Sequence, residues 1–326
     1  QNKEGGGIFM DIQCGGLISG CFITGNKAPG GGGLYIRGSQ PTIENCIVAA
    51  DSVSVVAGNG GGITIESSTV SMNSCIVDGC VATAAGGGLW IADSVVQMND
   101  CTVTNNVTTS SYGPGGGIMA EFNTDLTLTD CLIAGNEVFG NEPDSDGGGL
   151  RAVFATQLSL TRCTVAANSV AGALGAGISA KYCTPTVDRC IIAYNGPGAG
   201  LYCQPDMDAA FTVGCTDLFG NTGGDQICGT DAGDNFSLNP LFCDHPAGNY
   251  YLQAASPCAP GQHPNGPSAC GGSLLGALGT GCAPLDAGEA EPVRLALESR
   301  PNPVRRTAEI GFALPREARA TLRLFD

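Results

Sequence analysis

Four charged residues could form a catalytic group, because their spacing follows the repeat of the chain. Glu66 and Glu121 supply carboxylates that could hold calcium, and Arg151 or Lys181 could act as the base of a lyase. The simpler interpretation is a solvated face of mixed charge, since charged strand residues usually keep sheets soluble. We favour that interpretation and assign no catalytic residue.

A second pair of acids lies in the longest insertion of the chain. Asp144 and Asp146 could bind calcium, yet "EPDSDG" is also ordinary turn sequence. His245 and His263 have no matched nucleophile, and the cysteines form no CxxC pair. We therefore expect no metal centre and no cofactor, with calcium the one possible exception.

A column of outward-facing residues offers binding chemistry instead. It consists of Phe9, Tyr35, Thr64, Trp90, Met119, Arg151, Ser179 and Tyr202. Aromatic side chains in one column can stack on sugar rings, so the predicted glycan-binding face is Tyr35, Trp90, Met119 and Tyr202. The alternative is that Trp90 and its neighbours pack under the insertions at 52–59, 107–114 and 138–146, and both interpretations stay open.

The elements that must position these residues repeat along the chain. Three consecutive glycines end at Gly7, Gly33, Gly62, Gly88, Gly117 and Gly149, and degenerate forms end at Gly177 and Gly200. Successive steps are 26, 29, 26, 29, 32, 28 and 23 residues. A period of this length is typical of a solenoid, in which each repeat buries its apolar face against its neighbours.

Each repeat has the same internal pattern. An apolar-any-apolar triplet follows the glycines, a second short alternation comes next, and a cysteine lies 13 to 15 residues after the last glycine. An asparagine or aspartate usually follows five residues later. Alternation with period two predicts strands, and no helical periodicity separates them. Three short strands per turn predict a parallel β-helix.

The repeated cysteines form a predicted ladder of buried, reduced thiols. Its members are Cys21, Cys46, Cys75, Cys101, Cys131, Cys163, Cys190 and Cys215. Side chains in register point the same way rather than toward each other, which disfavours disulfides between rungs. A small apolar residue suits a narrow interior.

The cysteines near the C-terminal side predict disulfides. Cys203, Cys228, Cys243, Cys258, Cys270 and Cys282 lie where glycine and proline break the repeat, which indicates an oxidising, extracytoplasmic setting. Fifteen connectivities are open from the sequence. Our pairing hypothesis joins Cys228 to Cys243 and Cys258 to Cys270.

The run "GGGL…C.I..N", over roughly residues 5–221, resembles the right-handed parallel β-helix repeats of the pectin-lyase-like superfamily. The resemblance implies an all-β solenoid of about eight coils, closed by an irregular cap. That superfamily contains pectate lyases, polygalacturonases, alginate lyases and adhesins that are not enzymes, so the fold does not decide the function. Of the motifs shared by polygalacturonase-like hydrolases, the chain has only Asn123-Thr124-Asp125, which is also a turn entering a strand.

The tail differs in composition from the repeats. Its "PNP…T.I.F.LP……L.L.D" pattern, residues 301–326, resembles the start of the FlgD-like immunoglobulin-type module that often serves as a type IX secretion sorting domain. We predict a β-helix over 1–222, a cap over 223–284, a linker over 285–292 and the first strands of a β-sandwich over 293–326. Both ends read as truncations of a longer secreted bacterial protein.

Net charge narrows the possible partners. A formal charge of −16 disfavours nucleic acid and anionic membranes, and no apolar run is long enough to insert into a membrane. We expect an extracellular or cell-surface protein with a structural, adhesive or glycan-binding role. The expected partner is a glycan or another extracellular surface, and self-association is possible. The alternative is a polysaccharide lyase or hydrolase.

Overall fold

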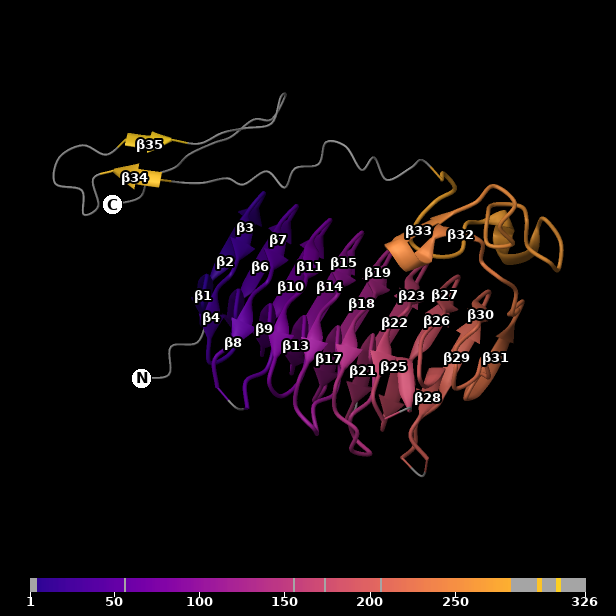
Figure 1. Ribbon diagram of the computed structural model, residues 1–326, viewed down its shortest axis with the longest axis horizontal. Coiled ribbons are helices and arrows are strands. Elements are labelled where there is room, and N and C mark those ends of the chain that lie inside the picture. Colours follow the sequence, from indigo (N-terminus) through magenta and orange to yellow (C-terminus); the bar gives the residue numbers. More distant parts are fainter. Residues whose placement is uncertain are drawn as a thin grey trace. The chain divides into compact units, whose positions relative to one another are not determined.

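The chain winds into an all-β parallel solenoid of about eight coils, as the glycine period predicts (Figure 1). This computed structural model describes residues 5–55, 57–154, 156–172, 174–205 and 207–282, together with the short strands at 298–300 and 309–311. Each coil contributes one strand to each of three long parallel sheets. A fourth sheet of two-residue strands, absent from the sequence prediction, follows the asparagine corner.

The strands are ordered so that each coil lies between its sequence neighbours. Sheet A contains β1 (Ile8–Asp11), β5 (Leu34–Arg37), β9 (Ile63–Glu66), β13 (Leu89–Ala92), β17 (Ile118–Glu121), β21 (Leu150–Val153), β25 (Gly175–Lys181) and β28 (Ala199–Cys203). Sheet B contains β2 (Gly15–Ser19), β6 (Gln40–Glu44), β10 (Thr69–Asn73), β14 (Val95–Asn99), β18 (Asp125–Thr129), β22 (Gln157–Thr161), β26 (Thr186–Asp188), β29 (Phe211–Gly214) and β31 (Gly229–Gly233). Sheet C contains β3 (Phe22–Thr24), β7 (Ile47–Ala49), β11 (Ile76–Asp78), β15 (Thr102–Thr104), β19 (Leu132–Ala134), β23 (Thr164–Ala166), β27 (Ile191–Ala193) and β30 (Asp217–Phe219). Sheet D contains β4 (Lys27–Ala28), β8 (Ser52–Val53), β12 (Val81–Ala82), β16 (Val107–Thr108), β20 (Glu137–Val138) and β24 (Ser169–Val170).

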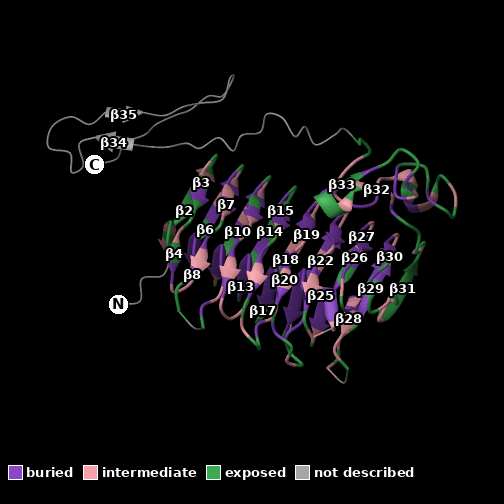
Figure 2. Cartoon of the chain, in the orientation of Figure 1, coloured by how far each residue is buried: buried purple, intermediate pink, exposed green. Residues whose placement is uncertain are grey.

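Equivalent residues of successive coils stack directly on one another. Ile63 pairs with Leu34 on one side and with Leu89 on the other, and all three are fully buried. Within each strand, the residues that alternate with these apolar residues point outward. The core is therefore a set of apolar ladders inside the solenoid, and Figure 2 shows the buried residues concentrated in the strands of the middle coils.

The glycines make the corner that precedes sheet A. Gly60 has a φ of +63°, a conformation that costs other residues free energy. A Cβ on Gly61 would lie 2.2 Å from the carbonyl oxygen of Gly87 in the next coil. The first glycine is thus required by backbone conformation and the second by the close approach of neighbouring coils.

The asparagines form a ladder of amide hydrogen bonds at the corner between sheets C and D, beside the glycines. Asn106 Nδ2 donates to Asn136 Oδ1 at 3.0 Å, and Asn136 Nδ2 donates to Asn168 Oδ1 at 2.9 Å. The residue before each asparagine has a left-handed conformation, such as Asn105 with a φ of +54°. The asparagine side chain can then turn inward, where it is buried.

Six cysteines, from Cys46 to Cys190, stack as buried free thiols inside the corner between sheets B and C. Cys75 Sγ donates to the carbonyl oxygens of Asn73 and Ile43, so the thiol donor is satisfied. The neighbouring thiol of Cys101, together with burial, raises the pKa of Cys75 to about 11. Cys21, on the first coil, is only partly buried.

Residues beyond the last coil fold back over the outside of sheet C. They contain an antiparallel pair, β32 (Phe242–Asp244) and β33 (Asn249–Leu252), and two short 3-10 helices, η1 (His245–Ala247) and η2 (Ala269–Gly272). Leu252 and Leu275 pack there against Leu132 and Ile191 of the coils. The last strand of sheet B, β31, ends at Gly233, so coil structure continues past residue 222.

Three disulfides tie the C-terminal region together, and they correct our pairing hypothesis. The bonds are Cys203–Cys228, Cys215–Cys270 and Cys243–Cys282. Neither predicted pair forms: Cys228 is bonded to Cys203 on the preceding coil, and the fold-back over sheet C brings Cys270 to Cys215. Cys215 also leaves the predicted thiol ladder: strand register aligns it with the turn residue Arg189, so Thr216 takes the position next to Cys190. Cys215 is bonded instead to Cys270 of the cap, with 5.6 Å between their Cα atoms.

Cys258, which we expected to be oxidised, is a buried free thiol that donates to a carboxylate. Its Sγ lies 3.3 Å from Asp217 Oδ2, and the other oxygen of Asp217 accepts the backbone N–H of Leu238 at 3.1 Å. Burial raises the pKa of Asp217 to about 7. This carboxyl joins the last coil to the cap.

Contacts divide the chain into two units, residues 1–282 and 283–326. In the second unit, β34 (Glu298–Arg300) pairs with β35 (Glu309–Gly311) in antiparallel fashion. The predicted linker at 285–292, and most of the predicted sandwich at 293–326, lie outside the described residues. In the part of the chain that the structure describes, no helix has the length and apolar character needed to cross a membrane.

Candidate functional site

The predicted glycan-binding face is covered. Strand register does place Tyr35, Trp90 and Met119 in one outward column of sheet A. Their exposed fractions are only 6%, 9% and 4%, whereas Tyr202 is partly exposed. Trp90 and Met119 pack with Ala92 and Val153 in a small apolar cluster outside the sheet. The column therefore forms a packed layer on the outside of sheet A.

The two glutamates of the proposed lyase site hold this layer in place. Tyr35 Oη donates to Glu66 Oε2 at 2.7 Å, and Trp90 Nε1 donates to Glu121 Oε1 at 3.0 Å. Burial raises the pKa of Glu121. Each contact joins an aromatic residue to the next coil, so both carboxylates already have a structural partner.

The two cationic residues of that proposed site are also paired. The insertion between β20 and β21 lays Asp144 and Asp146 beside Arg151, whose guanidinium contacts both carboxylates and is buried with Asp146. Lys181 Nζ lies 3.0 Å from Asp144 Oδ1. The lysine holds the pKa of Asp144 below its usual value, while burial raises the pKa of Asp146 to about 6.

This arrangement does not fit a calcium site. Calcium requires several oxygen ligands that converge on one point. Here the space between Asp144 and Asp146 is taken by the guanidinium of Arg151, and Lys181 occupies the outer side of Asp144. The structure thus brings Arg151, Lys181 and both aspartates together as an ion-pair cluster, and leaves Glu66 apart from it.

Sequence analysis missed a different column, the turn that directly follows sheet A. Phe122 and Phe154 stack with ring centroids 5.5 Å apart, and Phe154 and Tyr182 stack with centroids 5.7 Å apart. Their exposed fractions are 44%, 42% and 41%. We name these three residues the aromatic ladder.

The backbone of the aromatic ladder is in an unusual conformation for such residues. The φ angles of Phe122, Phe154 and Tyr182 are +52°, +54° and +55°. This left-handed region is costly for bulky side chains and is usually occupied by glycine, asparagine or aspartate. Among the equivalent turns of earlier coils, Gly38 and Asp93 follow that rule, whereas Ile12 and Ser67 do not. The left-handed turn is therefore shared by all of these coils, and the aromatic ladder differs from the other turns in its large exposed rings.

An open hollow lies at the Tyr182 end of the aromatic ladder. It has a volume of about 400 Å³ and is lined by Thr156, Gln157, Tyr182, Cys183, Thr184 and Asp208. Lys181 connects it to the ion-pair cluster, because its Nζ lies 5.9 Å from the centroid of the Tyr182 ring. The aromatic ladder and the hollow together present apolar ring surface beside hydroxyl, amide and carboxylate groups.

A sequence signal for the aromatic ladder existed. Each member lies five residues after the last glycine of its repeat, at Gly117, Gly149 and Gly177. Aligning the repeats on that glycine places Phe122, Phe154 and Tyr182 in one column. The signal was missed because we followed the strand alternation and treated the turn as a connection.

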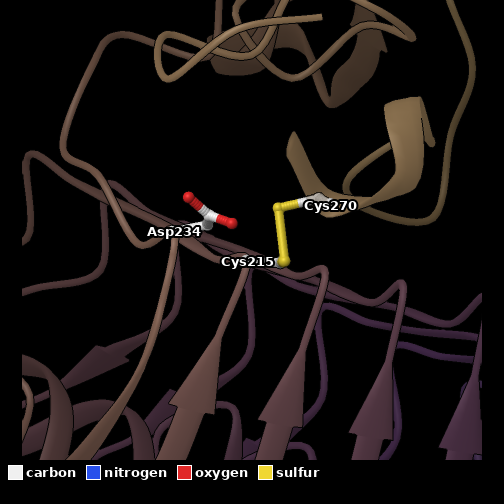
Figure 3. A group of neighbouring side chains, drawn as sticks. All are labelled: Cys215, Asp234 and Cys270. Carbon is white, nitrogen blue, oxygen red and sulfur yellow. A yellow bond between two sulfur atoms is a disulfide. The ribbon is translucent and has the colours of Figure 1, made fainter. Parts of the chain in front are cut away.

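One further cluster contains metal-binding atom types. The side-chain sulfur and oxygen atoms of Cys215, Asp234 and Cys270 lie within 4.8 Å of one another (Figure 3). The two sulfurs are bonded to each other, and metals bind thiolates rather than disulfides. Asp234 Oδ1 instead accepts a hydrogen bond from Asn265 Nδ2 at 3.0 Å. We interpret this cluster as a cross-link between the last coil and the cap.

Comparison with known proteins agrees with the fold. No curated protein and no solved structure matches the chain. The family described as "Right handed beta helix region" matches residues 1–114 and 56–239, which together cover more than half of the sequence. The protein belongs to the right-handed β-helix family.

Proposed function

We propose that this protein is a secreted or cell-surface protein that binds glycans through the aromatic ladder and the adjoining hollow. The β-helix fold supports a surface or carbohydrate-related role. The observation that carries the more specific proposal is the aromatic ladder itself: three large rings stand exposed in one column, at backbone positions that disfavour them. Sugar rings present apolar faces that pack well on aromatic side chains.

The hollow supplies the polar part of such a site. Thr184, Gln157 and Asp208 are exposed and line the hollow together with Tyr182. Binding sites for small polar ligands commonly combine aromatic walls with a few hydrogen-bonding groups. Each ring that packs on a sugar contributes about 1 kcal/mol, so measurable affinity requires several contacts along the aromatic ladder.

A glycan array with the wild-type protein and two variants tests this proposal. We expect Tyr182→Ala and Phe154→Ala to fold normally and to lose binding by about tenfold or more, because each removes an exposed ring. Tyr112→Ala is the matched control, since Tyr112 is an exposed aromatic residue in the loop before β17, whereas the aromatic ladder follows the strands of sheet A. Absence of glycan binding, or equal loss in the control, contradicts the proposal.

The alternative function, a polysaccharide lyase or hydrolase, is less well supported. A lyase base must be free to take a proton from the substrate. Arg151 and Lys181 are both ion-paired, and Arg151 is buried. Glu66 and Glu121 accept hydrogen bonds from the covered aromatic layer. We therefore place binding ahead of catalysis.

The setting that we propose is extracellular. Three disulfides are consistent with an oxidising compartment. We further propose that the tail belongs to a FlgD-like, type IX secretion sorting module of a bacterial protein. A formal net charge of −16 favours partners other than nucleic acid or anionic membranes. The proposed partner is a glycan on an extracellular surface, with self-association left as a separate possibility.

A further inference from the structure

Carboxylates lie at both ends of the aromatic ladder. Asp93 occupies the preceding rung of the same turn column, is exposed, and donates its backbone N–H to the carbonyl oxygen of Phe122 at 2.9 Å. At the other end Asp208, also exposed, lines the hollow with Tyr182. A ligand that follows the three rings along the solenoid axis therefore approaches a negative charge at each end.

The cations nearest the aromatic ladder are neutralised by acids of the same chain. Lys181, the base closest to the Tyr182 ring, pairs with Asp144, and Arg151 pairs with Asp144 and Asp146. The described residues that line the hollow include no lysine, arginine or histidine. An acidic group on a ligand would thus find no free positive charge in the lining.

The remaining lining groups suit hydroxyl groups. Thr184 and Gln157 are exposed and can both donate and accept hydrogen bonds, and both oxygens of the Asp208 carboxylate can accept from hydroxyl donors. The Oγ1 of Thr156 is already bonded to the carbonyl oxygen of Val153 at 2.6 Å. The available groups therefore bind an uncharged polyhydroxylated surface well and a carboxylate poorly.

We infer that the glycan is non-acidic: an uncharged sugar chain that lies along the aromatic ladder with one sugar in the hollow, where Asp208 accepts its hydroxyl groups. This inference rests on the proposed function and specifies its ligand class. Asp208 and Asp93 act as specificity-determining residues, because they repel uronate chains that have otherwise the same shape. The repulsion between exposed charges is screened by salt.

Matched oligosaccharides test the inference. The probes are 1,4-linked gluco-, manno- and galacto-hexasaccharides and the corresponding uronates oxidised at C6, with binding measured by calorimetry at low and high salt. We expect at least one neutral chain to bind, its uronate to bind at least tenfold more weakly at low salt, and the difference to narrow at high salt. Asp208→Asn should strengthen uronate binding by several-fold. Asp100→Asn, which removes an equal charge from an exposed turn between sheets B and C, should leave it unchanged.

The outcomes separate the two proposals. Uronate binding that equals or exceeds neutral binding, and that Tyr182→Ala abolishes, overturns the inference and leaves the glycan-binding function in place. An Asp208→Asn variant that behaves like Asp100→Asn overturns the role of Asp208. Failure of all six oligosaccharides to bind overturns the proposed function and with it the inference.

Discussion

Trp90 Nε1 donates to Glu121 Oε1 across 3.0 Å, from one coil to the next. Tyr35 makes the equivalent contact with Glu66 at 2.7 Å. In both cases an outward aromatic residue is held to the solenoid by a glutamate one coil further along. These contacts show that the outer surface of sheet A has a packed layer of its own, which stabilises the stack of coils.

Truncation of Trp90 should therefore affect stability and not glycan binding. We expect Trp90→Ala to lower the free energy of unfolding by about 3 kcal/mol, because it removes a buried ring and leaves Glu121 without its donor. Denaturant unfolding followed by circular dichroism measures the loss. Trp90→Phe, which keeps most of the packing, should lose less. If the Trp90→Ala protein were fully stable but bound glycans less tightly, the predicted glycan-binding face that contains Trp90 would be supported instead.

Thiol reactivity should follow the burial of each free cysteine. The exposed Cys14 should react with iodoacetamide within minutes in the native protein, and Cys21 more slowly, because burial raises the pKa of its thiol. The buried thiols from Cys46 to Cys190 should react only after unfolding. Mass spectrometry of peptides from native and denatured samples checks this. Native labelling of Cys101 at the rate of Cys14 would contradict the stacking described above.

The stability of the cap should depend on pH through Asp217. Its pKa is raised from 3.8 to about 7 by burial, so the folded protein keeps this proton where the unfolded chain has released it. The folded state binds more protons between about pH 4 and pH 7, so the free energy of unfolding contributed by Asp217 falls as the pH rises through this range.

Asp217→Asn should remove that part of the pH dependence. Asp51 and Asp146, whose pKa values burial raises to about 6, contribute slopes of the same sign, so the informative quantity is the difference between wild type and variant. Denaturant titrations at several pH values supply it. Parallel curves for the two proteins from pH 4 to pH 7 would show that Asp217 titrates normally.

Lyase activity should be absent. With Arg151 and Lys181 held by aspartates, an ultraviolet assay for unsaturated uronate products should show no turnover on uronic acid polymers, with or without calcium. Activity that Arg151→Ala or Lys181→Ala abolishes, and that Arg37→Ala leaves intact, would reverse the order of the two candidate functions.

The solenoid could be predicted because its signals are local and repeated. Gly60 and Gly61 are required by the corner that they form, and Cys75 lies at a fixed distance after them. The same stacking rule applies to every coil, so a strand or corner that is unclear in one repeat can be assigned from the equivalent positions of the others. The fourth sheet escaped notice because its strands have only two residues, too few to show alternation.

The site could not be predicted because it depends on segments that do not repeat. Alternation indicates that Trp90 points outward, but it gives no information about the chain that covers it. Cys215 shows the same limit: its place in the repeat suggested a ladder thiol, and only the fold-back of the cap reveals Cys270 beside it. Insertions differ from coil to coil, and the cap does not repeat. Comparing the repeats with one another therefore gives no information about them.

The asparagine ladder gives the solenoid a polarity. Along the ladder each Nδ2 donates to the next side chain on the C-terminal side, and the series ends where Asn221 Nδ2 donates to Asp225 Oδ1 at 2.7 Å. Each Nδ2 also donates to a backbone carbonyl oxygen of the preceding coil. A row of aligned amide dipoles thus terminates on a negative charge, the favourable sign. Removing one entire coil would rejoin an amide donor to an amide acceptor, whereas removing part of a coil would leave a buried amide without its hydrogen-bond partner in the ladder. The length of this protein can therefore change in whole coils but not in fractions of one.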